Sequence, residues 1–395
     1  MSKRLTKVLM IVYSHLPQDP RVRREANALK EKGYEVDIIC LKRKHQSTFE
    51  IIDGINLFRL NVEKSRSSKS RYIILYLTFF FKAFIKVNRL WLKNRYQVVH
   101  VHNMPDFLIF IPFLQKLFGT KIILDLHDPT PEVYLAKFNS GPKTIKLLEL
   151  QEKISIWFAD QIITTNIAFV DAFVKRGCPK EKITIVMNSP DDKIFNRINS
   201  VTRNSIIENK TIIMYHGVIL ERHGLDILVR AIDLLKNKIT NIELWVFGDG
   251  EFKSNFLELA DELKLDKIIK YFGPVELETI AETIPNVLIG VIPNRLNPFT
   301  NINFPTRIFE YLHFSKPVVV PKTQGISDYF NDNSIWFFEP DNLNDLADKI
   351  FNAVNKENEN NEILSKAKDV YLKHTWEFEK KKLVNLYKFI LDPNA

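Results

Sequence analysis

Buried-strand signals alternate with amphipathic helix signals along nearly the whole 395-residue chain, and this alternation limits the possible folds more than any other feature. β-Branched runs such as Val8–Val12 are followed by helical stretches, a pattern typical of a parallel sheet with crossover helices. The rhythm restarts at Thr211–Tyr215, after a stretch rich in Asn, Asp and Ser at 188–209. Because a chain of this length is too long for one core, the sequence predicts an α/β protein of two Rossmann-like domains. They would span residues 1–190 and 191–374, with parallel sheets facing a central cleft.

The same periodicity predicts several local elements. A helix is expected over 106–117, a rigid polar loop at Asp128–Glu132 and an exposed loop at Asn355–Asn361. Apolar residues recur at helical spacing after Trp376, which predicts an amphipathic C-terminal helix within 375–395. The apolar positions of that helix are Phe378, Leu383, Leu386, Phe389 and Ile390.

The cysteine content is typical of a reduced compartment. Only Cys40 and Cys178 occur, far apart and without the spacing of a disulfide framework or a zinc site. The N-terminus leads directly into the first strand and does not match a signal peptide. We therefore expect a cytoplasmic protein.

A basic, aromatic segment at 59–95 is the strongest indication of a partner surface. Residues 1–190 hold 31 Lys and Arg against 17 Asp and Glu, whereas the remainder is mildly acidic. The apolar run in the segment breaks at Lys82, short of the roughly 20 residues that a membrane span needs. The pattern indicates either a helix lying on the inner membrane surface or a core helix with a solvated basic edge. No recognised nucleic-acid motif accompanies the charge.

Residues 304–320 contain the parts of a nucleotide-binding element. Pro305 and Thr306 favour a helix start, and Arg307 and Glu310 then share one face of the predicted helix over 304–313. Free N–H groups and a cation would face the phosphates of a nucleoside diphosphate, and the carboxylate would accept the ribose hydroxyls. The alternative is an amphipathic helix whose Arg and Glu are only solvated.

Two glycine-containing loops follow predicted strands in the second half. The loop Gly217–Gly224 permits close approach of a ligand, and Arg222 within it could clamp a phosphate. The turn at Gly248–Gly250 is a weaker signal because it lacks the complete dinucleotide-binding fingerprint. Ordinary turns, with an exposed Arg222, are the alternative for both loops.

Polar residues also follow the predicted strands of the first half. His127 ends a strand and could donate a hydrogen bond to a sugar hydroxyl. His100 and His102 alternate onto one face, which could indicate a metal pair, but no carboxylate or third histidine completes it at a recognisable spacing. Asn103 and Asp106 are candidates for orienting a substrate. A structural role is the alternative for these side chains.

Arginines cluster at the start of the first predicted helix. Arg21 and Arg24 are spaced i and i+3, after Asp19, so they share a face and could bind an acceptor phosphate or a donor diphosphate. A solvated helix face is the alternative.

In chain order, these motifs resemble the retaining glycosyltransferases of family 4, which have the GT-B fold. The resemblance covers nearly the whole chain and fits the branch with an Asp-Pro-Arg-Val-Arg loop near the N-terminus. Its elements are the Asp19–Arg24 loop, His100–Asp106, His127, Asn188, Gly217–Gly224, Gly248–Gly250 and Phe304–Val320.

The resemblance implies that the second domain binds a nucleotide-sugar, expected to be a UDP-sugar, and that the first binds the acceptor. The C-terminal helix would cross back to the first domain, and domain closure would assemble the site. The catalytic residues would be His127, Arg222 and Arg307. The donor nucleotide would contact Gly217, Gly248, Gly250, Phe272, Val275, Thr306 and Glu310. The donor sugar or acceptor would contact Asp19, Arg21, Arg24, Asn103, Asp106, Thr300 and Asn301.

The sequence departs from the family at three positions. Val218 stands where the family has an arginine, and His223 where it has a lysine. Ile302 stands where the family has the first of two acids, so the sugar contact would pass to the backbone or to Thr300 and Asn301.

The expected reaction is retaining transfer of a sugar to a lipid-linked or growing surface-polysaccharide acceptor. It would need no metal and no cofactor, because the arginines and backbone N–H groups would stabilise the diphosphate. Two other functions fit the same fold. A sugar-nucleotide epimerase would turn over the donor without an acceptor, and a non-catalytic membrane-associated scaffold would not turn it over at all.

Overall fold

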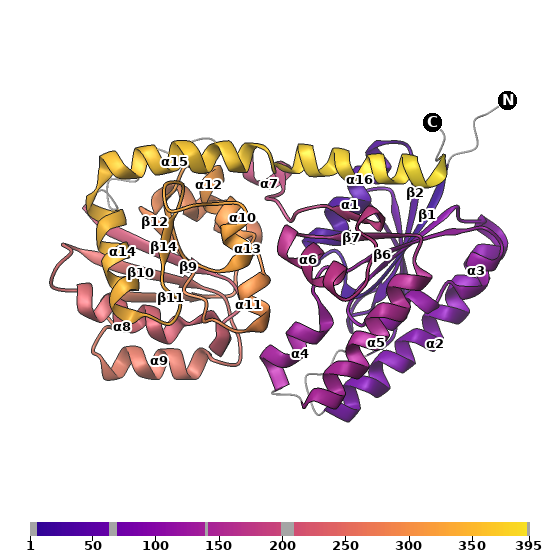
Figure 1. The fold of residues 1–395 in the computed structure, drawn as a ribbon, viewed down its shortest axis with the longest axis horizontal. Coiled ribbons are helices and arrows are strands. Elements are labelled where there is room, and N and C mark those ends of the chain that lie inside the picture. The colour runs from indigo at the N-terminus through magenta and orange to yellow at the C-terminus, as the bar shows by residue number, and fades with distance from the viewer. Residues whose placement is uncertain (1–5, 63–68, 139–140, 199–208, 393–395) are drawn as a thin grey trace. The chain divides into compact units, whose positions relative to one another are not determined.

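The computed structural model describes residues 6–62, 69–138, 141–198 and 209–392, which form two compact units. Unit 1 contains residues up to Asn188 together with the C-terminal segment from Glu377, and unit 2 runs from Ser189 to Trp376. Each unit has a sheet with helices packed on it (Figure 1). Parts of the 59–95 segment and of the 188–209 stretch, including Lys64 and Arg66, lie outside the described residues.

The sheet of unit 1 has the strand order β3-β4-β2-β1-β5-β6-β7-β8. All neighbouring strands pair in parallel except β3 and β4, which form an antiparallel edge that the sequence did not predict. The edge forms because Asp53 and Gly54, both with positive φ, turn the chain directly back. The strands are β1 (Lys7–His15), β2 (Glu35–Leu41), β3 (Phe49–Ile52), β4 (Ile55–Leu60), β5 (Val98–His102), β6 (Lys121–Asp125), β7 (Gln161–Thr164) and β8 (Ile183–Ile185).

The helices of unit 1 cover both faces of its sheet. On one face, α1 and α16 approach β5 through Glu25 and Tyr387. On the other face, Phe79 of α2 packs on Tyr13 of β1. The helical elements are α1 (Pro20–Glu31), α2 (Lys69–Asn94), η1 (Asp106–Phe110), α3 (Phe113–Leu117), α4 (Thr130–Phe138), α5 (Pro142–Phe158), α6 (Ile167–Lys175), η2 (Lys180–Lys182) and α16 (Trp376–Leu391).

The sheet of unit 2 is parallel throughout, with the order β11-β10-β9-β12-β13-β14. Its strands are β9 (Thr211–His216), β10 (Ile242–Phe247), β11 (Ile269–Gly273), β12 (Ile289–Val291), β13 (Val318–Pro321) and β14 (Trp336–Phe338). Its helices are α7 (Asp192–Phe195), η3 (Glu221–His223), α8 (Leu225–Leu235), α9 (Lys253–Glu262), α10 (Leu277–Thr283), η4 (Ile284–Asn286), α11 (Pro298–Ile302), α12 (Arg307–His313), α13 (Gln324–Ser327), α14 (Leu343–Asn355) and α15 (Glu357–Leu372). The strand order places a topological switch point between β9 and β12, where doubly wound sheets bind ligands.

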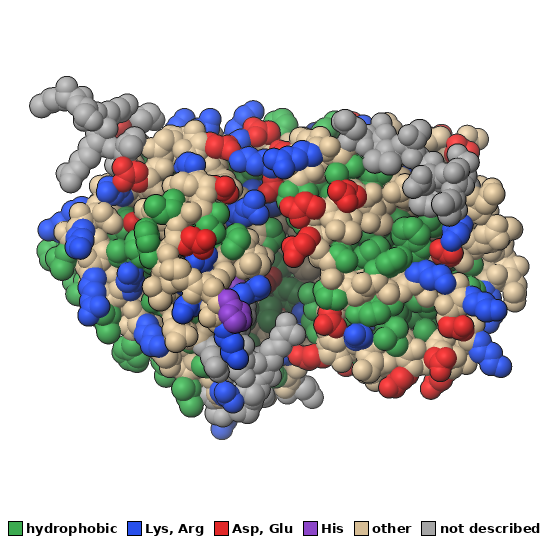
Figure 2. All heavy atoms as spheres, turned by 180° about the vertical axis from the view of Figure 1, so that it is seen from behind, with side chains coloured by type: hydrophobic (Ala, Val, Ile, Leu, Met, Phe, Trp, Pro, Cys, Tyr) green, Lys and Arg blue, Asp and Glu red, His purple; other side chains and the backbone are tan. Residues whose placement is uncertain are grey.

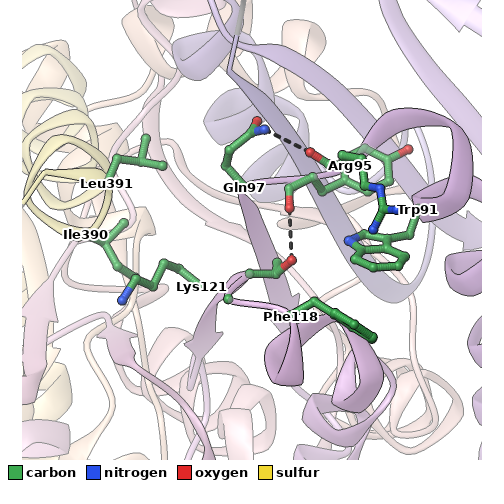
Figure 3. A pocket seen from close by; sticks show the side chains of 10 residues that line it. Trp91, Arg95, Gln97, Phe118, Lys121, Ile390 and Leu391 are labelled. Carbon is green, nitrogen blue, oxygen red and sulfur yellow. Dashed lines mark hydrogen bonds between the residues drawn. The ribbon is translucent and has the colours of Figure 1, made fainter.

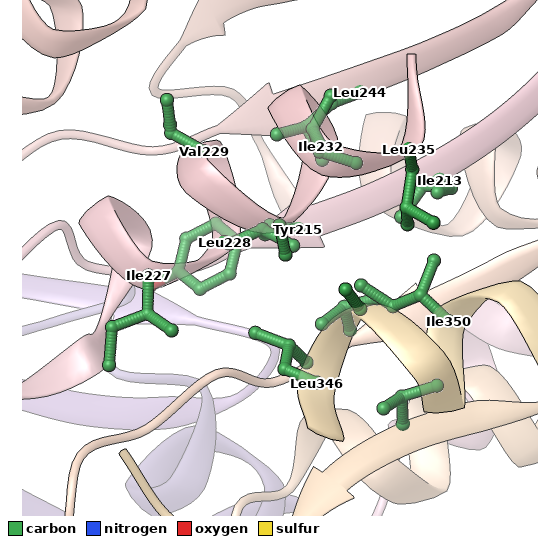
Figure 4. Close-up of a cluster of buried hydrophobic side chains, with 14 of the residues drawn as sticks. Ile213, Tyr215, Ile227, Leu228, Val229, Ile232, Leu235, Leu244, Leu346 and Ile350 are labelled. Carbon is green, nitrogen blue, oxygen red and sulfur yellow. The ribbon is translucent and has the colours of Figure 1, made fainter. Parts of the chain in front are cut away.

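A continuous apolar core holds α8 and α14 against the sheet of unit 2 (Figure 4). Leu228 and Ile232 of α8 lie at i and i+4, and both are fully buried with Tyr215 of β9. Leu346 and Ile350 of α14 repeat the spacing from the other helix. Burial of each such side chain stabilises the fold by about 1.5–3 kcal/mol, so the loop that follows β9 rests on a rigid base.

Three local expectations are wrong. Pro112 divides the expected helix over 106–117 into η1 and α3, because proline cannot donate the helical hydrogen bond. The expected rigid loop at 128–132 gives way at Thr130 to α4. The expected exposed loop at 355–361 is mostly the first turn of α15, where buried Asn360 accepts from Trp336 Nε1 and donates to Ala353 O.

The C-terminal helix packs on unit 1 through part of its predicted apolar face. Leu383, Leu386 and Ile390 are buried. Phe378 and Phe389 are about half exposed, at 50% and 54%, so these two do not belong to the packed face.

Candidate active site

The switch point of unit 2 brings together residues from β9 and α12. His216 ends β9, and Arg307 and Glu310 lie in the first turn of α12. Arg307 Nη1 donates to His216 O at 2.6 Å, and Glu310 Oε2 lies 2.6 Å from His216 Nε2. The predicted Arg and Glu are therefore close together, and they converge on a histidine that the sequence reasoning did not select. The signal for it was its place at the end of a buried strand, immediately before Gly217.

Hydrogen bonding shows that the Glu310–His216 contact carries a proton. The Tyr311 hydroxyl donates to Met214 O at 2.9 Å, so it accepts from His216 Nδ1–H, also at 2.9 Å. With Nδ1 protonated, Nε2 reaches Glu310 either as the second N–H of an imidazolium or as the acceptor from a protonated carboxyl. In either form the pair has no net charge, which allows a carboxyl group to sit here with a residue exposure of only about 9%.

Glycines in two loops allow their backbones to touch beside this group. Gly217 and Gly248 both have φ near +133°, a region that side-chain-bearing residues rarely adopt. A Cβ on Gly248 would lie 1.8 Å from Gly217 O, and one on Gly250 would lie 2.1 Å from Ile219 O. A Cβ on Gly217 would meet Arg307 Nη1 at 3.0 Å. The predicted glycine loops are therefore one packed layer at the carboxyl ends of β9 and β10.

Arg222 and His223 occupy η3 after the first glycine loop. The Arg222 guanidinium lies 5.9 Å above the Phe299 ring. His223 Nδ1 lies 2.5 Å from Val218 O. Burial, followed by the neighbouring Arg307 charge, lowers the pKa of His223 to about 3. His223 thus supplies no positive charge near neutral pH, so the nearby cations are Arg222 of this loop and Arg307 of α12.

Phe272 forms an aromatic platform beside the glycine layer. Its ring stacks on Phe247 at 4.5 Å between centroids and 5° between planes, and 48% of the residue is exposed. Gly248 N donates to Gly273 O at 2.8 Å, which ties the platform to the loop. Val275 is 39% exposed nearby in the chain. A half-exposed ring with a fixed orientation is suited to stacking against a flat base.

The segment before α12 uses its polar side chains for local structure. Among the described residues, the Thr306 side chain makes no capping hydrogen bond, contrary to the expected N-cap, and α12 starts at Arg307 instead of 304. Thr300 is 3% exposed, accepts from Asn297 N and donates to Arg295 O in the cap of α11. Asn301 Oδ1 accepts from Gln324 N at 3.3 Å, beside Ile302 in α11.

Unit 1 has its own switch point between β1 and β5. Asp19 follows β1 and caps α1, accepting from Arg21 N, and its carboxylate also pairs with Arg21 Nε at 3.3 Å. Burial raises the pKa of Asp19, but Arg21 and two histidines outweigh it and lower the pKa overall. Asp19 is thus a buried anion that orients Arg21.

His127 is fixed by a chain of side-chain contacts. Arg24 Nη2 donates to Asn188 Oδ1 at 3.3 Å, which sets the amide so that Asn188 Nδ2 donates to His127 Nε2 at 3.0 Å. His127 therefore carries its proton on Nδ1, which faces Asp125 Oδ1 at 3.3 Å. Arg24 and Asn188 are positioned by the fold to select this tautomer.

Asn103 and Asp106 hold the turn that presents His127. Asn103 Oδ1 accepts from His127 N, and its Nδ2 donates to Asp128 O at 2.7 Å. Asp106 is fully buried and accepts from Asn103 and from Thr130 Oγ1. Burial raises the pKa of Asp106 to about 6. These contacts organise the loop, and a direct contact with substrate stays a prediction.

A buried polar cluster lies behind His127. It consists of Glu25, His100, His102 and Asp125, each at most 3% exposed, and the ligand atoms of the four lie within 4.8 Å of one another. Burial raises the pKa of Glu25 to about 7. Burial also acts to raise that of Asp125, but His127 and His102 lower it well below its usual range. The sequence reasoning saw only the two histidines, because the carboxylates come from α1 and β6.

A separate pocket opens at the other end of the unit 1 strands, where the strands begin. It has a volume of about 360 Å³ and lies beside Gln97 and Lys121, at the amino ends of β5 and β6, with Trp91 and Phe118 in its wall (Figure 3). Ligands of parallel sheets bind at the carboxyl ends, so this pocket is distinct from the candidate site.

The exposed side of α2, α3 and α5 is unusually apolar. Residues such as Phe81 (61% exposed), Phe118 (70%) and Trp157 (78%) face solvent, with Lys and Arg side chains spread over the same unit in the left half of Figure 2. The opposite side of α2 is core, since Phe79, Ala83 and Val87 are fully buried. The core interpretation therefore holds for this side of the helix, and the membrane interpretation stays a prediction for the exposed side. Of the helices in the described ranges, none combines the length and apolar content that crossing a bilayer requires.

The two Rossmann-like units, each with its polar residues at a switch point, define an α/β protein of the GT-B type. Residues 21–193 match the family model described as Glycosyltransferase Family 4, and residues 196–370 match the one described as Glycosyl transferases group 1. The chain is therefore a glycosyltransferase with a family 4 domain followed by a group 1 domain. The predicted fold class is confirmed.

Three known proteins illustrate the range of similarity. An uncharacterised glycosyltransferase of Methanocaldococcus jannaschii is 23% identical over 388 residues, 93% of each chain. A lipopolysaccharide 1,2-N-acetylglucosaminetransferase of Salmonella typhimurium is 24% identical over 231 residues, covering 53% of this chain and 57% of its own. The structure of Anabaena HepE in complex with UDP-glucose has a TM-score of 0.69 at 13% identity and covers 97% of this chain and 99% of its own.

Proposed function

We propose that this glycosyltransferase is a retaining enzyme that transfers a sugar from a nucleotide-sugar to a lipid-linked or growing surface-polysaccharide acceptor. A UDP-sugar is the first candidate for the donor. The observation that carries the proposal is the convergence of Arg307, Glu310 and His216 on one switch point beside the Phe272 platform. A carboxylate, cations and an exposed flat ring are the groups that a ribose, a diphosphate and a base require.

Each group then has a separate task in donor binding. Glu310 uses one oxygen for His216, and its remaining lone pairs accept the two ribose hydroxyls. Phe272 stacks on the base, while Gly217 and Gly248 let backbone N–H groups approach the diphosphate with Arg222 and Arg307. Thr306 and Val275 border this nucleotide.

In unit 1, His127 is proposed to contact the donor sugar near its reacting carbon. Both ring nitrogens have partners in the structure, Nδ1 in Asp125 and Nε2 in Asn188, so a sugar hydroxyl would donate to Nε2 in place of Asn188. Asp19, Arg21 and Arg24 would guide the acceptor, and the leaving phosphate would help to take the acceptor proton. Stabilisation of that phosphate by arginines and N–H groups would require no metal there.

A screen against nucleotide-sugars tests the donor and the reaction class together. The purified chain is mixed with UDP-, GDP- and ADP-sugars, and thermal shift and nucleotide release are measured with and without a polyprenyl-linked glycan. Acceptor-dependent release, with the product keeping the anomeric configuration of the donor by NMR, is expected. Donor turnover without acceptor would instead identify an epimerase, and binding without turnover a scaffold.

The His127→Ala variant separates catalysis from binding. We expect transfer to fall at least a hundredfold, while the dissociation constant for UDP stays within twofold of the parent protein. His45→Gln, at an exposed histidine of the same unit, is the control. Transfer unchanged in His127→Ala would show that the assignment is wrong.

We also propose that the apolar side of α2 rests on the inner membrane surface, with the protein otherwise in the cytoplasm. The exposed phenylalanine and isoleucine side chains next to Lys82 and Arg89 fit an anionic interface. Phe81→Glu is expected to abolish flotation with anionic vesicles, whereas Phe378→Glu, a similarly exposed position on α16, should not. Equal flotation of both variants would contradict this surface.

A further inference from the structure

The buried cluster behind His127 contains nitrogen and oxygen atoms that have no hydrogen-bond partner. Among the described residues, His100 Nε2, His102 Nε2 and Glu25 Oε2 are buried without a hydrogen-bond partner. Each unpaired polar atom in such a position costs roughly 1–3 kcal/mol. The three atoms belong to side chains from α1 and β5 that meet on one face of the sheet.

The other ring nitrogen of each histidine is already held. His102 Nδ1 donates to Asp125 Oδ2 at 2.8 Å, and His100 Nδ1 lies 2.9 Å from the Tyr387 hydroxyl. Orientation of a histidine by a carboxylate, with the second nitrogen left for an ion, is the usual support around a metal ligand. The imidazole rings stack at 4.2 Å between centroids with 26° between their planes, and one ligand atom of each lies within 4.8 Å of the other.

We propose that Glu25, His100 and His102 bind a divalent transition-metal ion inside unit 1, with zinc as the first candidate. Two imidazole nitrogens and one carboxylate oxygen form a donor set that zinc and its neighbours prefer over magnesium or calcium. In a tetrahedron with bonds of about 2.1 Å the ligand atoms lie about 3.4 Å apart. The ligand atoms of Glu25, His100 and His102, now within 4.8 Å of one another, would therefore move closer together on binding.

The site is separate from the phosphate-binding groups, and the inference does not depend on the proposed donor or acceptor. It reaches the candidate active site through Asp125, which contacts both His102 and His127. Binding at His102 Nε2 keeps the proton on Nδ1 and thereby keeps Asp125 in place. Asp125 would therefore act as a positioning residue between the ion and His127.

The first experiment is metal analysis of the untagged full chain. The protein is expressed in defined medium containing zinc or cobalt, so that the ion is present while the chain folds around the buried site. We expect about one equivalent of metal after gel filtration and, for cobalt, a visible ligand-field absorption. Less than a tenth of an equivalent of either ion in natively folded protein would overturn the proposal and leave water as the occupant.

Matched variants then assign the ligands. His100→Gln and Glu25→Gln are expected to lower bound metal at least tenfold and remove the cobalt absorption. His313→Gln is the control, because His313 Nδ1 also lies 2.9 Å from a tyrosine hydroxyl, that of Tyr371, but belongs to unit 2. Metal retained in Glu25→Gln and His100→Gln, or lost equally in His313→Gln, would refute the assignment. If His100→Gln does not fold, Glu25→Gln, which preserves size, decides the question.

Discussion

Replacement of Glu310 by glutamine tests the candidate nucleotide site most directly. The side chain is nearly buried, and Oε2 lies 2.6 Å from His216 Nε2. Glutamine keeps the size of the side chain, and its amide can donate to a neutral His216 Nε2, so the local hydrogen bond survives. What disappears is the negative charge that the carboxylate–imidazolium form of the pair would offer to two ribose hydroxyls.

The expected loss follows from the strength of hydrogen bonds to a charged acceptor. Such bonds contribute about 1.5–3 kcal/mol, against about 1 kcal/mol for neutral ones, and little screening applies at this burial. For two hydroxyls the net loss is about 1–4 kcal/mol, which corresponds to a dissociation constant raised roughly 5- to 700-fold. The melting temperature should change little, because His216 stays anchored by Tyr311.

The assay is calorimetric titration of the full chain with UDP, or with GDP or ADP if the screen selects one of these. Glu278→Gln is the control, because Glu278 also lies in the first turn of a seven-residue helix of unit 2, α10, but is exposed. A dissociation constant within twofold of the parent for Glu310→Gln, with native melting, would refute the ribose role. A similar loss in both variants would indicate a general effect of charge.

Three further predictions concern the glycine layer, the loop histidine and the thiols. Gly248→Ala should lower the free energy of unfolding by more than about 2 kcal/mol in urea titrations, because a Cβ would lie 1.8 Å from Gly217 O. The control Gly33→Ala, at φ +87° with nothing within 4 Å of the added Cβ, should lower it by only about 1 kcal/mol. Equal losses in the two variants would argue against the clash. His223, with its pKa lowered to about 3, should be neutral above about pH 4, so the pH–rate profile of His223→Gln should match that of the parent between pH 5 and 9; because its folded pKa is below its unfolded pKa, it should destabilise the fold only as the pH falls below about 6.5. Cys40 and Cys178, whose pKa values burial raises to about 11, should be only about one-thousandth thiolate at pH 8 and should react with a thiol reagent only after unfolding; rapid labelling of native protein would contradict their burial.

The strand pattern of the fold was predictable because buried parallel strands are nearly continuous apolar runs. Val318–Val320 and Thr211–Tyr215 are of this kind, and both lie within observed strands. The hairpin of β3 and β4 was not predicted, since its edge residues such as Phe49 and Ile51 are exposed and give no alternating burial. The burial of Asn360 was not predicted for a different reason. Asn360 is a polar residue at the start of α15, and its hydrogen-bond partners, Trp336 and Ala353, belong to other elements.

Site residues were predictable where the chemistry and the helical spacing coincide. Arg307 and Glu310 are three residues apart, and the structure keeps them together. His216 and Asn188 were not assigned roles, because their partners lie 94 and 61 residues away, at Glu310 and His127. The cluster of Glu25 with the two histidines of β5 depends likewise on a sheet that brings α1 over β5, which no local spacing encodes.

Ile302, which stands where the family resemblance predicts an acid, limits how this chain could hold the proposed donor sugar. Thr300, two residues before it, is 3% exposed, and its hydroxyl accepts from Asn297 N and donates to Arg295 O in the cap of α11. A hydroxyl that both accepts and donates locally has little capacity left for a sugar. Asn301 gives one oxygen to Gln324 N, so its amide hydrogens are the side-chain donors that this segment can offer in place of a carboxylate. An amide binds a sugar hydroxyl with a neutral hydrogen bond, about 1 kcal/mol instead of 1.5–3, and donates where an acid accepts. The affinity of this chain for its donor should therefore depend more on the proposed base and ribose contacts of Phe272 and Glu310 than on this segment.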